Sequence, residues 1–422
     1  MKSEKSIYNL CLKNTLVFFL TLFFTYILGF IIYNSFNNYG SVKRGSDISV
    51  TNDLFKLNEE EVFSLGSNRP ECPEERGACW IYNMPIKETP SEIYNIERDT
   101  HKMVHLPNNI LYQPYGILLD KDKLLLTNVS KSKIIPKDNI GVKGTDFSIY
   151  KTMAVIDLKT NKIIQTFDKK INKQYEPNQQ HTTYTLLNNG KVLIIDFENQ
   201  IAEVYCPCLN NSYTINFHNN NQRVNVVLPF KQNQALIFGD TKNNYNKEDS
   251  IILYDDNTKI FKEFGHAIRR SNPYVIPLND NKFLIIGGRI FKSNGGQELD
   301  VREIEIFDGN NGTSKIVNKL PYQLKYDDNL DKNSFAITKL NDSYLLLTGG
   351  SHGVYPFRKD RKSTLIIDLK KNEIKRGPNL VYDIASHKML KVSDDKILIF
   401  GNHHWIDNKK TQILKINKRR IK

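Results

Sequence analysis

A short apolar run recurs along this chain at intervals of about fifty residues, a period typical of repeat folds. Each run is rich in Leu, Ile and Val and ends in Asn, Asp, Gly or another turn-forming context. The runs lie at residues 123–128, 192–197, 235–240, 283–288, 344–350 and 396–402. Runs of this length, bounded by turn residues, are typical of buried β-strands, because a helix would need a longer periodic segment.

Further strands are predicted on both sides of each run. One precedes it, as at residues 335–342, and another follows it after a loop of variable length. Most of the following strands end in an Asp or Asn whose side chain can hydrogen-bond to the backbone two residues on and so begin a tight turn. These residues are Asp157, Asp255, Asp308, Asp368 and Asn417. A fourth strand is expected after the turn, which gives four strands in each unit. The six units therefore predict an all-β fold, a six-bladed β-propeller.

The sixth unit ends at residues 412–417 and lacks a fourth strand of its own. Closure of the ring would require that strand from the start of the domain, and closure would remove two exposed sheet edges. We therefore assign the propeller to residues 65–422 and expect the closing strand within residues 65–95. Residues 34–64, which are polar and include three consecutive glutamates, are predicted to be a tether.

Glycine pairs that close two of the apolar runs, at residues 287–288 and 349–350, give the chain a resemblance to the kelch family. Residues 239–240 and 401–402 are degenerate versions of the same pair, and His181 and His387 begin inner strands where that family often has a histidine. The Trp that the family carries late in each repeat is missing, and Trp80 and Trp405 do not fill that place. The resemblance covers about residues 100–417 and implies a kelch-like propeller; it leaves the function open, because propellers carry many functions.

An apolar segment at residues 15–33 contains no charged residue and, as a helix, would span roughly 28 Å, close to the thickness of a bilayer core. No small-residue cleavage site follows it, so the segment is predicted to be a transmembrane signal anchor. Lys2, Lys5 and Lys13 precede it, which places residues 1–14 in the cytoplasm by the positive-inside rule. The propeller is then expected outside the cytoplasm, on a single-pass membrane protein.

The composition excludes wholesale disorder, since 40% of the residues are hydrophobic and 25% are charged. The chain contains 59 Lys and Arg against 46 Asp and Glu, a net charge of +13 that favours acidic partners. Five cysteines are too few for a disulfide scaffold. Outside the cytoplasm, Cys72 and Cys79 could close a small disulfide loop, whereas the pairing of Cys206 and Cys208 stays open.

Loops after the second strand and loops before the first strand of each blade share one face of a propeller. This arrangement brings six basic residues towards the same rim: His181, Arg270, Arg289, His352, Arg358 and His387. They are predicted to form a cationic site for an anionic ligand; the alternative is that they are solvated loop residues and structural histidines. No catalytic residue, metal ligand or cofactor is predicted.

The expected function is binding of a protein or glycan partner near the membrane; nucleic acid is not expected as a partner. Two alternatives stay open: a purely structural or assembly role, and a sugar-modifying enzyme, which the resemblance implies because kelch-type propellers include sugar mutarotases. Copper oxidases of the galactose oxidase type use a Tyr–Cys crosslink, and the cysteines at positions 11, 72, 79, 206 and 208 do not suit that mechanism. An enzyme would need two or three titratable groups together in one pocket.

Overall fold

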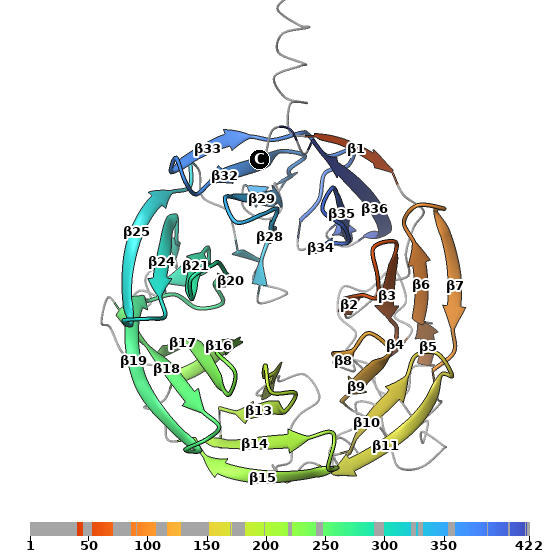
Figure 1. Ribbon diagram of the computed structural model, residues 1–422. Helices are drawn as coiled ribbons and strands as arrows, with labels where there is room; N and C mark the ends of the chain where they lie inside the picture. The colour runs from red at the N-terminus through yellow and green to blue at the C-terminus, as the bar shows by residue number, and fades with distance from the viewer. Residues whose placement is uncertain are drawn as a thin grey trace, which may run out of the picture.

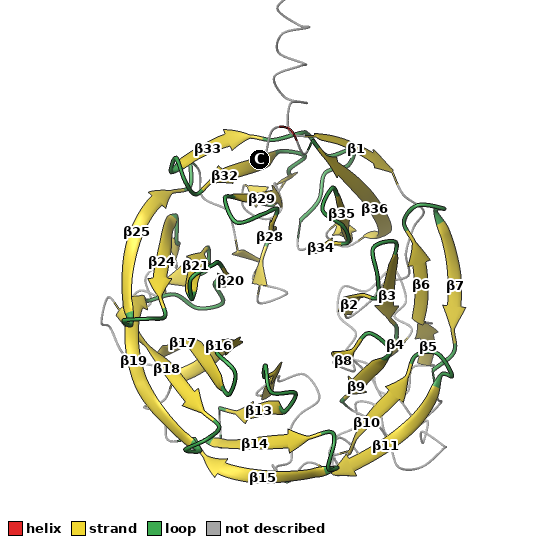
Figure 2. Ribbon diagram, in the orientation of Figure 1, coloured by secondary structure: helices red, strands yellow, loops and turns green. Residues whose placement is uncertain are grey.

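The chain folds into a seven-bladed β-propeller, in which the blades form a ring and the first strand of each faces the centre (Figure 1). The computed structural model describes residues 40–44, 53–70, 86–89, 91–106, 116–127, 152–168, 170, 182–197, 199–217, 222–241, 248–290, 299–321, 326–327, 332–352, 359–385, 387–403, 406–417 and 419. These residues contain no α-helix, and strands and their connections account for almost all of them (Figure 2).

The blades are numbered in chain order, and each is an antiparallel sheet of four strands. Blade 1 contains β2 (Asp53–Lys56), β3 (Glu61–Leu65), β6 (Ser91–Asn95) and β7 (Thr100–Val104). Blade 2 contains β8 (Gly116–Asp120), β9 (Lys123–Leu126), β10 (Thr152–Asp157) and β11 (Lys162–Asp168). Blade 3 contains β12 (Thr182–Leu186), β13 (Val192–Asp196), β14 (Ile201–Cys206) and β15 (Asn211–Asn216). Blade 4 contains β16 (Gln222–Phe230), β17 (Gln234–Thr241), β18 (Glu248–Asp255) and β19 (Ile260–Ile268).

The remaining three blades follow the same plan. Blade 5 contains β20 (Tyr274–Pro277), β21 (Lys282–Ile286), β24 (Glu303–Asp308) and β25 (Thr313–Lys319). Blade 6 contains β28 (Phe335–Lys339), β29 (Tyr344–Gly349), β32 (Thr364–Asp368) and β33 (Glu373–Arg376). Blade 7 contains β34 (Lys388–Lys391), β35 (Lys396–His403), β36 (Ile406–Ile416) and, as its outer strand, β1 (Gly40–Arg44).

The predicted number of blades, six, is wrong: the structure has seven, and blade 1 is the one that was missed. Its second strand, β3, is as deeply buried as the other second strands: Val62, Phe63 and Leu65 are fully buried. Its sequence lacks the aliphatic run of the other six, because Phe63 and Ser64 stand in the middle of it. The three glutamates at residues 59–61 made residues 34–64 resemble a tether, although β1, β2 and all of β3 except Leu65 lie there.

The ring closes through β1, which pairs with β36 in antiparallel register from Gly40↔Ile416 to Arg44↔Gln412. Closure by an N-terminal strand was expected, but residues 65–95 do not supply it: part of that range forms β6 and the hairpin of β4 (Ser67–Pro70) and β5 (Ile86–Thr89). The segment was missed because an edge strand buries one face only. In β1 that face reduces to Val42, which packs against the core between blades 6 and 7.

The hydrophobic core lies between the blades. Seven clusters of buried side chains each join two neighbouring blades, including one in which Val62 and Tyr94 of blade 1 meet Leu398 and Phe400 of blade 7. The second strands contribute most because both of their faces are covered; all five residues of β13, for example, are buried. This explains why the second strands are continuous apolar runs.

The tight turns after the third strands are built as predicted. Asp157 Oδ1 accepts hydrogen bonds of 2.9 Å from the backbone N–H groups of Lys159 and Thr160. Asp255, Asp308, Asp368 and Asn417 accept equivalent bonds in their own blades. In blade 1, Asn95 does the same for Glu97 and Arg98. These side chains therefore stabilise the outer hairpins of blades 1, 2, 4, 5 and 6. In blade 7 Asn417 only follows β36, because the outer strand of that blade is β1.

Among the described residues there is no helix that is long and apolar enough to cross a membrane. The predicted anchor at residues 15–33 lies outside the described residues, as do Cys72 and Cys79.

Candidate functional site

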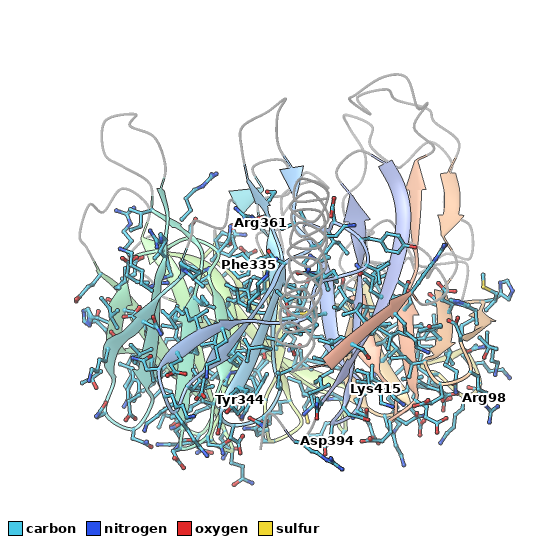
Figure 3. The ribbon with its side chains drawn as sticks, turned by 90° about the horizontal axis from the view of Figure 1, so that it is seen from above. Arg98, Phe335, Tyr344, Arg361, Asp394 and Lys415 are labelled. Atoms are coloured by element: carbon cyan, nitrogen blue, oxygen red, sulfur yellow. The ribbon has the colours of Figure 1, made fainter. Side chains whose placement is uncertain are left out.

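The two faces of the ring are built differently. One face, here called the turn face, carries the short turns between first and second strands and between third and fourth strands. The other, the loop face, carries the connections between second and third strands and those between blades. In the side view, Tyr344, Asp394 and Arg98 lie on the turn-face side, whereas Arg361 lies nearer the loop-face side (Figure 3).

The loop face also carries additional hairpins. The described residues contain four two-stranded sheets outside the blades: β4–β5, β22 (Arg289–Ile290) with β23 (Leu299–Asp300), β26 (Tyr326–Asp327) with β27 (Lys332–Asn333), and β30 (Ser351–His352) with β31 (Lys359–Asp360). All four lie in connections of the loop face. These hairpins therefore add surface to the loop face that is not required for closure of the propeller ring.

The glycine pairs shape this face at the ends of second strands. Gly287 and Gly288 have φ values of 72° and 82°, in the left-handed region that favours glycine. A Cβ on Gly288 would approach the carbonyl oxygen of Ser271 to 2.6 Å. The pair therefore lets the loop pack against the preceding inter-blade connection, where Ser271 and Arg289 exchange backbone hydrogen bonds of 2.8 and 3.1 Å.

Arg270, one of the predicted ligand-binding residues, lies on this face but is used inside the protein. Its side chain is 2% exposed, and its Nη2 lies 3.0 Å from Oε2 of Glu305, whose side chain is 1% exposed. Its Nη1 donates to the backbone carbonyls of Gly287 and Glu303. Burial lowers the pKa of Arg270, and the neighbouring Glu305 opposes that shift. Arg270 therefore ties blade 4 to blade 5 and does not offer its charge to an external ligand.

Arg289 remains the predicted residue best placed for a ligand. It begins β22 directly after the glycine pair and is half-buried. Its backbone is held both by Ser271 and by the β22–β23 pairing with Asp300. A backbone fixed on both sides gives this side chain a defined place on the loop face.

His387 is also buried, at 4% exposure, between blades 6 and 7. Its Nε2 lies 2.6 Å from Oγ1 of Thr348, so the two groups share a hydrogen bond. A Cβ on Gly401 would come within 2.3 Å of the Cβ of His387, and one on Gly349 within 2.6 Å of its Cε1. His387 is thus packed between two glycines, as the structural alternative predicted.

Of the other predicted residues, His181 and Arg358 lie outside the described part of the chain. His352 pairs through its backbone with Lys359 in the β30–β31 hairpin. The structure therefore brings Arg270 and Arg289 together, places His387 at a different blade junction, and leaves the other three without a described side chain.

Sequence reasoning missed a buried glutamate that occurs three residues before the turn residue of a third strand. Glu92, Glu203 and Glu305 occupy this position, and they are 3%, 0% and 1% exposed. Glu203 accepts a 2.8 Å bond from the backbone of Lys170, and Glu305 accepts bonds from the backbone of Ile268. Glu203 and Glu305 therefore fix the chain as it leaves the preceding blade, whereas Glu92 Oε2 lies 2.9 Å from Nδ1 of His101 within blade 1. The fixed spacing was the signal that could have revealed them.

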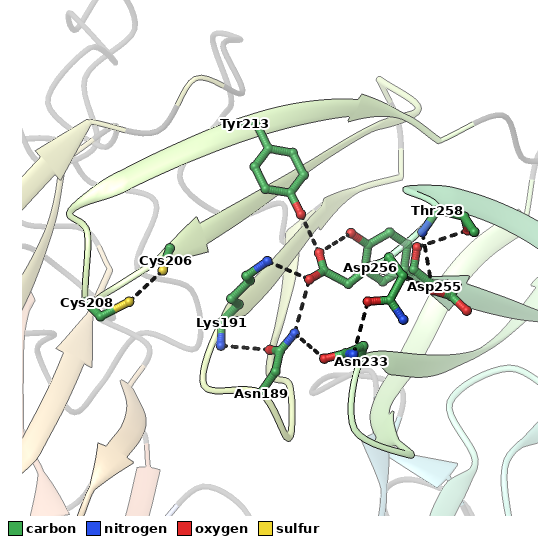
Figure 4. Close-up of polar contacts among 11 residues, drawn as sticks. Asn189, Lys191, Cys206, Cys208, Tyr213, Asn233, Asp255, Asp256 and Thr258 are labelled. Carbon is green, nitrogen blue, oxygen red and sulfur yellow. Dashed lines mark hydrogen bonds and ion pairs between the residues drawn. The ribbon is translucent and has the colours of Figure 1, made fainter.

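A second polar cluster lies on the turn face between blades 3 and 4, around Asp256 (Figure 4). Its carboxylate accepts hydrogen bonds from Lys191 Nζ at 2.7 Å, Tyr254 OH at 2.9 Å and Asn189 Nδ2 at 3.1 Å. The hydroxyl of Tyr213 also donates to it. The Asp256 side chain is 4% exposed, whereas that of Lys191 is 31% exposed.

The charges of this cluster are held by mutual contacts. Burial disfavours ionisation of Asp256, but the hydrogen bonds from Lys191, Tyr213 and Tyr254 outweigh it and hold its pKa below the ordinary value. The hydrogen bond to Asp256 raises the pKa of Lys191, and burial raises the pKa values of Tyr213 and Tyr254. Both phenols therefore keep their protons and act as donors. The cluster is an ionised clamp between two blades.

The described residues contain no group of three His, Cys, Asp or Glu side chains that could hold a metal ion.

Comparison with known proteins supports the fold alone. No family model matches the chain, and no curated protein sequence matches it. Among solved structures, a fungal alcohol oxidase of the AA5 family, determined in complex with copper, superposes with a TM-score of 0.60. The alignment covers 90% of this chain and 76% of that chain at 12% sequence identity. At this identity the likeness shows a shared propeller architecture.

Proposed function

We propose that this chain is a membrane-anchored, kelch-type propeller that binds a protein or glycan partner through its loop face, outside the cytoplasm. The observation that carries the proposal is the concentration of all four additional hairpins of the described residues on one face. Binding residues in proteins are commonly presented on loops that a rigid scaffold positions. The glycine pairs at residues 287–288 and 349–350 support the kelch-type assignment.

The chemistry favours an anionic partner. The chain has a net charge of +13, and Arg289 is held on the loop face by backbone hydrogen bonds on both sides. Arg270 does not enter the proposal, because Glu305 neutralises it inside the protein. A partner with carboxylate or sulfate groups would meet the half-buried Arg289 on the loop face, and complementary charge across an interface steers association and selects among partners.

The copper named for the structural neighbour finds no matching donor set in the described part of this chain. Its only described cysteines, Cys206 and Cys208, are on the turn face, away from the loop face. We therefore derive no copper chemistry for this chain.

The binding test uses the full chain in detergent with two anionic probes, heparin and a sialylated glycoprotein. We expect binding to weaken as salt rises, since exposed charges are screened over about 8 Å at physiological ionic strength. Arg289→Ala should weaken binding about two- to fivefold. The matched control is Arg419→Ala, an exposed arginine that follows β36 at the turn-face end of blade 7. Equal losses from both variants would contradict a site on the loop face.

The proposed placement has a separate test. Protease added to intact cells or spheroplasts should digest the propeller and spare a tag on the N-terminus. Protection of the propeller together with digestion of the tag would contradict the proposed topology and leave the loop-face binding to be judged by the first test.

A further inference from the structure

The outer turn of blade 3 departs from the rule that the other five outer hairpins, in blades 1, 2, 4, 5 and 6, follow. In those five blades the last residue of the third strand is an Asp or Asn that holds the turn with its side-chain oxygen. In blade 3 this place belongs to Cys206, and Cys208 stands two residues further on. The position that elsewhere donates a backbone N–H to the Asx side chain therefore carries a second thiol here.

The turn places the two sulfur atoms in direct contact. Sγ of Cys206 lies 2.9 Å from Sγ of Cys208 (Figure 4). Pro207 separates them, and its ring fixes the backbone φ between the two thiols. The backbone N–H of Leu209 donates to the carbonyl of Cys206 at 3.2 Å, which closes the turn. Neither sulfur is engaged in a disulfide, and the contact is that of two thiols.

Contacts with residues of blade 2 hold this turn in place. The ring of Tyr205 stacks on Phe167 of blade 2 with 3.6 Å between the ring centroids. Gln165 Nε2, from the same strand of blade 2, donates to the carbonyl of Pro207 at 3.2 Å. Cys208 is nevertheless exposed and Cys206 is partly exposed, so a reagent in solution can reach both sulfur atoms. The fold thus presents a positioned pair of thiols at the surface.

We propose that Cys206 and Cys208 form a redox-active dithiol that closes to an intramolecular disulfide by exchange with a small disulfide of the glutathione class. One cysteine thiolate attacks a sulfur of the small disulfide, a mixed disulfide forms, and the first small thiolate leaves and takes up a proton. The second cysteine thiolate then attacks the cysteine sulfur of the mixed disulfide, and the second small thiolate leaves. The protein dithiol is oxidised by two electrons, and the small disulfide is reduced to two thiols.

The proposal explains the missing Asp or Asn. In the oxidised form a covalent bond between positions 206 and 208 replaces the side-chain hydrogen bond that stabilises the other five outer turns. In the reduced form the hydrogen bond between the sulfurs raises the pKa of Cys208, so this thiol keeps its proton and can donate it to Cys206. Exchange then accelerates as the pH rises, because the thiolate is the attacking species.

The sequence offers a clean measurement, because Lys191 and Arg223 bound a tryptic peptide that contains both cysteines and no other. The full chain is reduced, equilibrated in glutathione buffers of graded redox ratio, quenched with acid, alkylated and digested. We expect peptide 192–223 to pass from a doubly alkylated form to an unalkylated form that is lighter than the reduced peptide by two hydrogen atoms. A peptide that stays doubly alkylated at every ratio would overturn the proposal.

Two variants and a denatured control separate the site from incidental thiol chemistry. Cys208→Ser should stop at a mixed disulfide with glutathione on Cys206, whereas the Cys72→Ser/Cys79→Ser double variant should close as the native chain does. In guanidinium chloride the closed form should require a roughly tenfold more oxidising buffer, since the fold no longer holds the sulfurs together. Equal closure in the folded and unfolded chains, or loss of closure in the double variant, would contradict a site built by the turn.

Discussion

Two polar contacts join neighbouring blades on opposite faces of the ring, and they differ in how far water reaches them. On the loop face, Arg270 and Glu305 are 2% and 1% exposed, and both charges lie wholly inside the protein. On the turn face, Asp256 is 4% exposed, but its partner Lys191 is 31% exposed and its other donors are neutral hydroxyl and amide groups. The first contact depends on one charge balancing another; the second depends on many donors around one anion.

The exposure of each contact determines how well the propeller tolerates a substitution there. Removing one member of a buried ion pair leaves the other charge buried without a partner. The resulting loss of stability is larger than the stability that the pair itself contributes. At Asp256 the cation can turn to solvent if the carboxylate is lost. Variants at the two contacts should therefore differ in how much stability they cost.

Glu305→Ala should give the largest loss, about 3–5 kcal/mol in the free energy of unfolding, because Arg270 remains charged and buried. Urea unfolding of the purified chain measures it. The double variant Arg270→Met/Glu305→Leu should recover part of the loss, since it removes both charges. A single variant that costs less than about 1 kcal/mol would show that water reaches Arg270 after all.

Asp256→Asn should cost less, about 1–3 kcal/mol, because the side chain keeps its shape but loses its charge and one acceptor. Tyr254 and Tyr213 would then compete for the single amide oxygen, while Lys191 would turn to water. The same urea measurement applies. A loss as large as that of Glu305→Ala would mean that water is excluded from the two contacts to the same extent.

The contribution of Asp256 should also depend on pH. Its pKa in the folded chain lies below the ordinary value of 3.8, so the unfolded state binds a proton first as the pH falls. The stabilisation is therefore present above that value and is lost as the pH falls through the folded pKa. The difference in unfolding free energy between the native chain and Asp256→Asn should shrink over this acidic range. A constant difference would contradict an ionised Asp256.

Lys191→Met should have the smallest effect, about 1 kcal/mol or less, since a partly exposed cation contributes little to stability. Thermal unfolding at low and high salt checks it: the native chain should lose slightly more stability with salt than the variant does. A loss equal to that of Asp256→Asn would make the Lys191–Asp256 ion pair, and not the set of donors, the basis of the clamp.

Much of the fold could be predicted because the second strand of a blade is buried on both faces. All six predicted runs are second strands, and five predicted turn residues hold their turns. Blade 1 was missed because Ser64 interrupts the aliphatic pattern of β3, although its neighbours bury it to 1% exposure. The closing strand β1 was missed because an edge strand needs few apolar residues.

The candidate site was less predictable. The order of strands and loops was enough to place Arg270 and Arg289 on one face. Whether such a charge is buried, however, depends on which side chains of the next blade pack against it. Glu305, which neutralises Arg270, follows it by a long stretch of chain and looks like an ordinary strand residue in the sequence. The Asp256 cluster was invisible for the same reason, since its donors come from two blades.

The pairing of β1 with β36 has a consequence for biosynthesis. The ribosome makes β1 before any other strand of the ring and β36 after all of them, so blade 7 cannot be completed until the rest of the propeller has left the exit tunnel. Until then β1 must wait unpaired, and the contacts of blade 1 with blade 7 cannot form. Non-local pairing of this kind slows folding and leaves a nascent chain open to misassembly. The ring can therefore close only after β36, the last strand, has been translated.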